Sequence, residues 1–303
     1  MSKYIVKRIG LAIVTIFVIS IITFFAMNAI PGGPFDSEKA TTPEVRAVLE
    51  KRYNLHKPLV EQYVIYMKNV LHGDWGVSLK TGRDIGKTLF SSFAVSAKLG
   101  GMALLISVIF GVVLGSIAAL MRNKWPDRLI VFFTTLMTAM PSFVLATFLL
   151  YFFCIKLGWV QVWSSQSHNY LLPVISLSLY PMAYITRLTK TSMLDVLGQD
   201  YVRTARAKGV SQRKVIFKHA LRNALIPVVT YIGPEIAFII TGSMVVENIF
   251  TIGGLGEKFV SCISNRDYTM IMATTLFLAT IMVFANLLTD IAYKLIDPRI
   301  SLE

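Results

Sequence analysis

The sequence is poor in charged residues, in acidic residues and in cysteine. Charged side chains make up 16% of 303 residues, against roughly a quarter in soluble globular proteins. Two cysteines are too few for a disulfide framework, and the 4 histidines have no partner at i, i+4 and no nearby cysteine pair that would indicate a metal site. These shortages exclude a disulfide-rich scaffold and an ordinary soluble enzyme.

Long apolar runs take the place of the missing charge. Hydrophobic residues make up 54% of the chain, and the mean hydropathy is +0.61. A bilayer core about 30 Å thick needs about 20 helical residues, and six nearly charge-free stretches reach or approach that length. The sequence therefore predicts an all-α polytopic membrane protein with six transmembrane helices. The stretches are Ile9–Ile30, Leu99–Met121, Leu129–Ile155, Tyr170–Thr186, Ala224–Val246 and Tyr268–Thr289.

The first stretch differs from a cleavable signal peptide. Its apolar run exceeds the 7–15 residues of a signal-peptide core, and no A-x-A site follows, so we expect it to be retained. A bond between Cys154 and Cys262 is conceivable, but the sequence favours two unreactive thiols.

The distribution of basic residues predicts the orientation. Of the 30 Lys and Arg residues, 17 lie in the termini and in the connections after the second and fourth stretches, and 3 lie in the short connections on the other side. Positive residues collect on the cytoplasmic side, so we expect both termini in the cytoplasm. The surplus of basic residues is thus explained by topology, and nucleic-acid binding is not expected.

Residues 31–98 are expected to form an extracytoplasmic insert between residues 1–30, which hold the first transmembrane helix, and a core over 99–303. The spacing of apolar residues predicts short amphipathic helices over Glu44–Tyr53 and Leu59–Leu71. The insert could be a cap that packs on its own apolar faces or a docking surface for an external partner, and the sequence leaves both open.

The cytoplasmic loop over residues 187–223 has a helical core at Asp200–Lys208 that ends at Gly209, a residue typical of helix C-termini. Ser211 is positioned to cap a second helix leading into the fifth stretch. The alternatives are a solvated basic helix pair and a rigid lever held by a cytoplasmic protein.

Two further features concern chemistry. The glycine run at Gly253–Gly256 lacks the lysine and the strand–loop–helix context of a phosphate-binding loop, so we expect a turn or re-entrant element. Glu235 is the one acid in the middle of an apolar stretch, and it should face a wet cavity or a polar partner. It could make an interhelical hydrogen bond, line a substrate pathway or couple transport to protons.

The loop sequence DYVRTARAKGVSQRKVIFKHALRNALIP, from Asp200 to Pro227, resembles the EAA loop of bacterial ABC importer permeases in its peptide-transporter form. Ala205, Gly209 and Leu221 match the family pattern. Arg203 and Thr204 stand where the name-giving Glu and first Ala occur, and Arg222 replaces the usual proline. The segments Ala29–Asp36, Glu247–Val260 and Asp297–Arg299 are similar to the oligopeptide branch, so the resemblance covers essentially the whole chain.

The resemblance implies a type I importer permease fold in a bacterial plasma membrane. It implies an ATPase-coupling loop that includes Asp200, Arg203, Thr204, Ala205, Lys208, Gly209, Leu221 and Arg222. It also implies a homologous second permease, an external peptide-binding protein and two ATP-binding subunits, which would hold ATP and Mg, while this chain binds no cofactor and is not an enzyme.

The resulting hypothesis is a permease subunit of an ATP-driven oligopeptide importer. A dipeptide or nickel importer permease is the alternative in the same class. A secondary transporter coupled through Glu235 is the alternative in a different class, although no inverted repeat of the expected kind is visible.

Overall fold

The computed structural model describes residues 2–31, 56–164 and 166–296. The expected all-α fold class is confirmed: apart from one isolated bridge between Val77 and Asp84, the regular structure of the described residues is helical. The elements are α1 (Ser2–Ala29), α3 (Leu59–Leu71), α4 (Ile85–Leu120), α5 (Trp125–Ala139), α6 (Ser142–Leu149), η1 (Leu150–Lys156), α7 (Leu171–Leu197), α8 (Asp200–Ala207), α9 (Gln212–Lys214), η2 (Val215–Leu221), α10 (Arg222–Ala224), α11 (Ile226–Ile240), α12 (Met244–Ile249), α13 (Leu255–Ser264) and α14 (Tyr268–Ile296).

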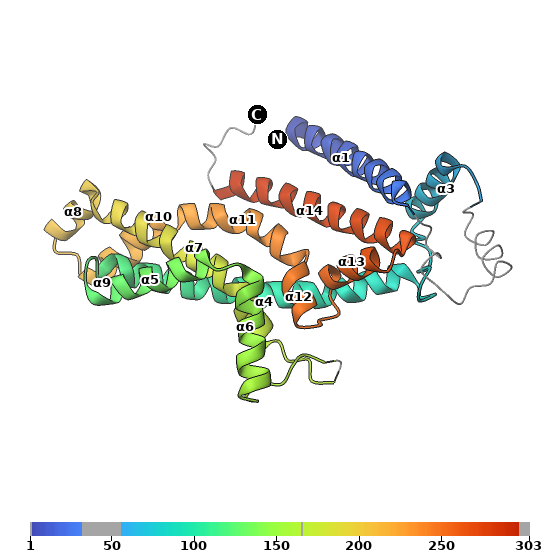
Figure 1. Cartoon of the computed structure of the whole chain (residues 1–303). Helices are drawn as coiled ribbons and strands as arrows, with labels where there is room; N and C mark the ends of the chain where they lie inside the picture. Colours follow the sequence, from blue (N-terminus) through green and yellow to red (C-terminus); the bar gives the residue numbers. More distant parts are fainter. Residues whose placement is uncertain (1, 32–55, 165, 297–303) are drawn as a thin grey trace.

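Within the part of the chain that the structure describes, five helical segments are long and apolar enough to cross a membrane: Val6–Ala29, Ile85–Leu120, Leu171–Leu197, Ile226–Ile249 and Tyr268–Ile291. A sixth candidate is the bent pair of Trp125–Ala139 and Ser142–Lys156. The main helices run along one long axis, with α3 at one end and α8 at the other (Figure 1).

The third apolar run, Leu129–Ile155, forms a bent pair of helical segments rather than one continuous helix. The chain bends by 104° between α5 and the segment that begins at Ser142. Met140 precedes Pro141 and is extended, with ψ of 131°, because the proline ring disfavours helical backbone in the residue before it. In Figure 1, α6 consequently points away from the long axis that α5 follows.

Two helices are longer than their charge-free runs. α4 begins at Ile85 rather than Leu99, and α7 continues to Leu197 rather than ending at Thr186. The side chain of Asp84 accepts a hydrogen bond from the Lys87 amide at 2.7 Å and caps α4. The ends of an apolar stretch show where charged residues begin, whereas α4 and α7 continue into the charged segments beside their stretches.

The helix expected over Leu59–Leu71 is confirmed with the same bounds, and the one expected over Glu44–Tyr53 lies outside the described residues. α3 packs on the ends of α1 and α14 in an apolar cluster of Tyr63, Tyr66, Met67, Phe24, Met27, Leu79, Tyr268 and Met272. Asp267, just before α14, accepts hydrogen bonds from Ser78 Oγ and from the Leu79 amide at 3.1 Å. The described part of the insert is thereby joined to the helical core.

Both cysteines are free thiols. Cys262 is buried on α13, and burial raises the pKa of its thiol to about 11. Since the thiolate is the reactive form, this thiol is protected from alkylation at neutral pH.

α4 packs closely against α7 through small residues. A Cβ on Gly115 would lie 2.5 Å from the Thr186 carbonyl oxygen, and one on Gly111 would lie 2.7 Å from Ile185 Cγ2. Ser107 Oγ also donates across the contact to the Ser178 carbonyl at 2.9 Å. Small residues of this kind let two helix backbones approach closely inside a membrane.

We predict that Gly115→Ala destabilises the protein by about 1–3 kcal/mol, the cost of overpacking a close contact. Gly101→Ala is the matched control on the same helix, because a Cβ there meets no atom within 4 Å. The thermal midpoint of each purified variant in the same detergent is the measurement. Equal midpoints would show that α4 and α7 are not in this close contact.

Candidate functional site

The predicted helix at Asp200 forms α8, which is held by its apolar face. Val202 and Ala205 are buried against Val215 of η2, at the end of the molecule farthest from α3 (Figure 1). Asp200, Arg203, Thr204, Arg206 and Lys208 are exposed, so the helix presents a basic outer surface. The ion pair between Arg203 and Asp200, 3.6 Å apart, is solvent-exposed and contributes little to stability.

α8 ends as the sequence predicted, at a glycine in the left-handed conformation. Gly209 has φ of 76°, its amide donates to the Arg206 carbonyl at 3.0 Å, and the Val210 amide donates to the Ala205 carbonyl at 3.1 Å. These two bonds form a Schellman motif, and Val210 packs against the buried face of α8 as that motif requires. The chain therefore reverses sharply at Gly209.

Beyond Gly209 the helical segments α9, η2, α10 and α11 follow one another into the membrane. Ser211 occupies the predicted N-cap position, but its side chain makes no capping bond, so that part of the prediction is wrong. Leu221 lies apart from α8 and packs with Met193, Ala220 and Ala224, while Arg222 is exposed. The predicted coupling residues are thus divided between α8 with its C-terminal turn and the η2–α10 segment that precedes α11.

A buried ion pair that the sequence did not reveal lies between the start of α5 and α7. Lys190 Nζ is 2.5 Å from Asp127 Oδ1, and the Asn123 amide donates to Asp127 Oδ2 at 2.9 Å. Asp127 is 4% exposed. Because α7 leads directly into α8, the pair fixes the helix that positions the basic surface.

Glu235, on α11, lines a cavity of about 870 Å³ beside the α5–α6 bend. The walls come from α7, α11, α12 and α14, and include Tyr180, Phe238, Met244 and Met282. The side chain of Tyr231, one turn earlier on α11, approaches the Glu235 carboxylate. Among the described residues, no group of three or more His, Cys, Asp or Glu side chains could hold a metal ion.

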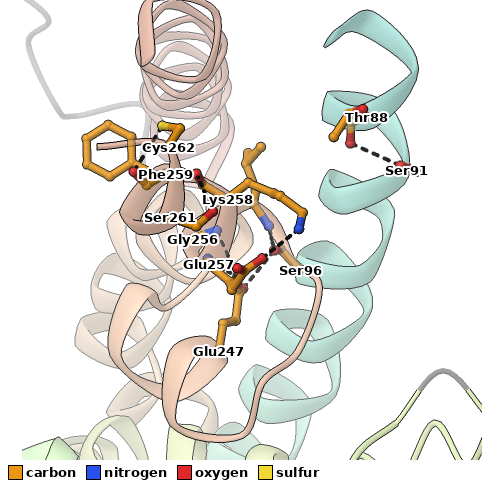
Figure 2. A network of polar contacts seen from close by, with 11 residues as sticks. Thr88, Ser91, Ser96, Glu247, Gly256, Glu257, Lys258, Phe259, Ser261 and Cys262 are labelled. Carbon is orange, nitrogen blue, oxygen red and sulfur yellow. Dashed lines mark hydrogen bonds and ion pairs between the residues drawn. The ribbon is translucent and has the colours of Figure 1, made fainter. Parts of the chain in front are cut away.

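A second acid, Glu247 on α12, is fully buried and was missed in the sequence because it follows the end of the fifth apolar stretch. Figure 2 shows its carboxylate between α4 and the first turn of α13. It accepts hydrogen bonds from Ser96 Oγ at 2.7 Å and from the amides of Gly256 and Glu257 at 2.8 and 3.1 Å. Ser96 Oγ in turn accepts from the Leu255 amide at 2.7 Å. Three otherwise unpaired amides at the start of α13 are satisfied in this way.

Gly242 and the glycine run at Gly253–Gly256 make room for this carboxylate. A Cβ on Gly242 would lie 2.6 Å from Glu247 Oε1, and one on Gly254 would lie 2.6 Å from Glu247 Cδ. The run is the start of α13, with Gly254 as its N-cap, rather than the expected turn or re-entrant element, and it lets the backbone close around Glu247. Glu247 lies close to these glycines in the sequence, and this spacing was the one local sign of the contact. The other partner of Glu247, Ser96, is 151 positions away in the sequence.

Comparisons with known proteins agree along the whole length of the chain. Residues 111–302 match the family described as the binding-protein-dependent transport system inner membrane component, and residues 1–97 match the corresponding N-terminal family. The chain belongs to this family. It is an inner-membrane permease, a transport component rather than an enzyme, and the secondary-transporter alternative is set aside.

Curated relatives of the permease span its full length. It is 46% identical to the dipeptide transport system permease protein DppB of Bacillus subtilis, over 100% of this chain and 99% of that protein. It is 42% identical to the oligopeptide transport system permease protein OppB of Haemophilus influenzae, over 99% of both chains. A crystal structure of an amino acid ABC transporter with histidines is similar in fold, with a TM-score of 0.54 and 15% identity over 71% of this chain and 94% of that one.

We predict that Glu247→Ala destabilises the permease by on the order of 3 kcal/mol, because Ser96 and two backbone amides lose a buried charged acceptor. Glu257→Ala is the matched control, since Glu257 makes an ion pair with the neighbouring Lys258 at 2.9 Å. Its replacement should cost less than about 1 kcal/mol. Thermal midpoints and detergent-solubilised yields measure both. A loss for Glu257→Ala as large as that for Glu247→Ala would contradict this assignment.

Proposed function

We propose that this permease forms one half of the translocation pathway of an ATP-driven peptide importer, and that oligopeptides are its substrates. The names of its full-length relatives support peptides, and both dipeptide and oligopeptide permeases are among them. The segment Ala29–Asp36 favours the oligopeptide branch, by resemblance. The observation that carries the coupling role is α8: a short basic helix, buried on one face and exposed on the other, at one end of the molecule.

The proposal includes partner subunits. A homologous second permease would complete the pathway, an external binding protein would deliver peptide, and two ATP-binding subunits would hold ATP and Mg. α8 would dock on an ATP-binding subunit through its exposed residues Arg203, Arg206 and Lys208. Because Val202 and Ala205 fix α8 to η2, a movement of the ATP-binding subunit would be passed to α11.

Glu235 would line the pathway. It faces the cavity at the α5–α6 bend, and α11, which carries it, is the helix reached by the chain that leaves α8. This arrangement connects the proposed ATP-driven movement with the proposed position of the substrate.

The orientation follows from charge. α3 and α8 lie at opposite ends of the molecule (Figure 1), and the 17-to-3 distribution of basic residues favours α8 on the cytoplasmic side. α3 would then face outward, toward the binding protein, and both termini would be cytoplasmic.

We predict that Gly209→Val uncouples the transporter. Val at positive φ costs about 1–2 kcal/mol, so α8 would be redirected while the transmembrane helices stay folded. Peptide-stimulated ATP hydrolysis and ATP-dependent peptide uptake should each fall by on the order of tenfold in complexes matched for subunit content. Gly209→Asn is the control, because Asn tolerates this conformation and no atom lies within 4 Å of its Cβ. If Gly209→Val kept normal peptide-stimulated ATP hydrolysis and normal peptide uptake, α8 would have no part in coupling the two.

The orientation is tested by cysteine labelling. In a background without Cys154 and Cys262, Lys68→Cys on α3 should react with a membrane-impermeant maleimide added outside whole cells. Lys214→Cys on α9 should react only after the membrane is opened. Both side chains are exposed in the structure, so the side of the membrane on which each lies, and not burial, decides whether it reacts with the maleimide. The reverse pattern would invert the proposed topology.

A further inference from the structure

The cavity at the α5–α6 bend contains a carboxyl group that has a tyrosine neighbour, Tyr231, but no ion pair. Glu235 is the only charged residue among the described residues that line it. The ion pairs found in the described ranges join other residues, and none includes Glu235. A carboxylate within a membrane span is costly unless a cation or hydrogen-bond donors compensate it. The cavity therefore favours a cationic group.

One tyrosine, Tyr231, approaches this carboxylate, and another, Tyr180, lines the same cavity. Tyr231 approaches Glu235, and the Tyr184 ring stacks on Tyr231 with centroids 4.3 Å apart. Tyr180, one turn before Tyr184 on α7, lines the cavity and is 54% exposed. The face of a tyrosine ring carries negative charge density and attracts an ammonium group. The aromatic groups thus favour the same kind of ligand as the carboxylate.

An unpaired hydroxyl group lies on the same wall. Ser176, one turn before Tyr180 on α7, lines the cavity and is 4% exposed, and its Oγ has no hydrogen-bond partner. The hydroxyl of Ser178, two residues further, is paired with the Ile175 carbonyl at 2.8 Å. A buried hydroxyl without a partner is unfavourable, so a ligand with a polar group would satisfy it.

From these three observations we propose that the cavity is a subsite for the free amino-terminal residue of the peptide in transit. Its ammonium group would bind Glu235 and the ring face of Tyr180, and the hydroxyl of Ser176 would donate to the first peptide carbonyl. A volume of about 870 Å³ is in the range of pockets that hold small organic ligands. This inference rests on the proposed peptide-import function and adds the chemical group that the permease itself recognises.

The test uses the complete transporter in proteoliposomes, with its binding protein and ATP. Uptake is measured for free-amine and N-acetylated forms of one peptide, chosen so that both forms are shown to load the binding protein and supplied at saturation. The wild type should prefer the free-amine form. Glu235→Gln, which keeps the shape of the side chain, should reduce that preference by about tenfold, the range of a hydrogen bond to a charged group. Ser176→Ala should lower uptake of both forms.

Thr275→Val is the matched control, because Thr275 lines the same cavity but its hydroxyl already donates to the Ile271 carbonyl at 2.8 Å. It should keep the wild-type preference. An unchanged preference in an assembled Glu235→Gln complex would overturn the subsite, as would an equal loss for both peptide forms. Either result would leave the import function in place. The absence of ATP-dependent uptake of any peptide by the wild type would instead overturn the proposed function.

Discussion

The contact between α4 and α7 is the constraint on which the other features depend. Gly111 and Gly115 allow the two backbones to meet, and each helix then carries part of a different site. α4 supplies Ser96 to the Glu247 network, while α7 supplies Ser176 and Tyr180 to the cavity and continues toward α8. A displacement between these helices would therefore disturb the Glu247 network, the cavity and α8 together.

The few charges inside this apolar protein fall into two groups. Asp127 and Glu247 are compensated: the first by Lys190 and a backbone amide, the second by Ser96 and two amides. Both connect segments far apart in the sequence and are parts of the framework. Glu235 lines a cavity and has no ion pair among the described residues. That difference separates a structural acid from one available to a ligand.

Local sequence information was sufficient for several elements. The apolar spacing of Leu59–Leu71 and the helix-ending Gly209 both depend on near neighbours, and both were predicted correctly. The sharp break at Pro141 does not follow from the sequence alone, because a proline permits either a kink in a continuous helix or a break, and neighbouring helices decide between them. Glu247 and the Asp127–Lys190 pair depend on contacts across 151 and 63 positions, which no local pattern contains.

The Schellman turn at Gly209 also has a mechanical consequence. From Gln212 onward, the helical segments through Glu235 follow one another with no long loop between them. At about 1.5 Å per residue, this run of helical segments measures roughly 35 Å along the chain. In a rigid segment of that length, a tilt of only about 5° at the end near α8 would displace the far end by about 3 Å, the length of one hydrogen bond. A small rotation of α8 is therefore enough to make or break a single contact at Glu235.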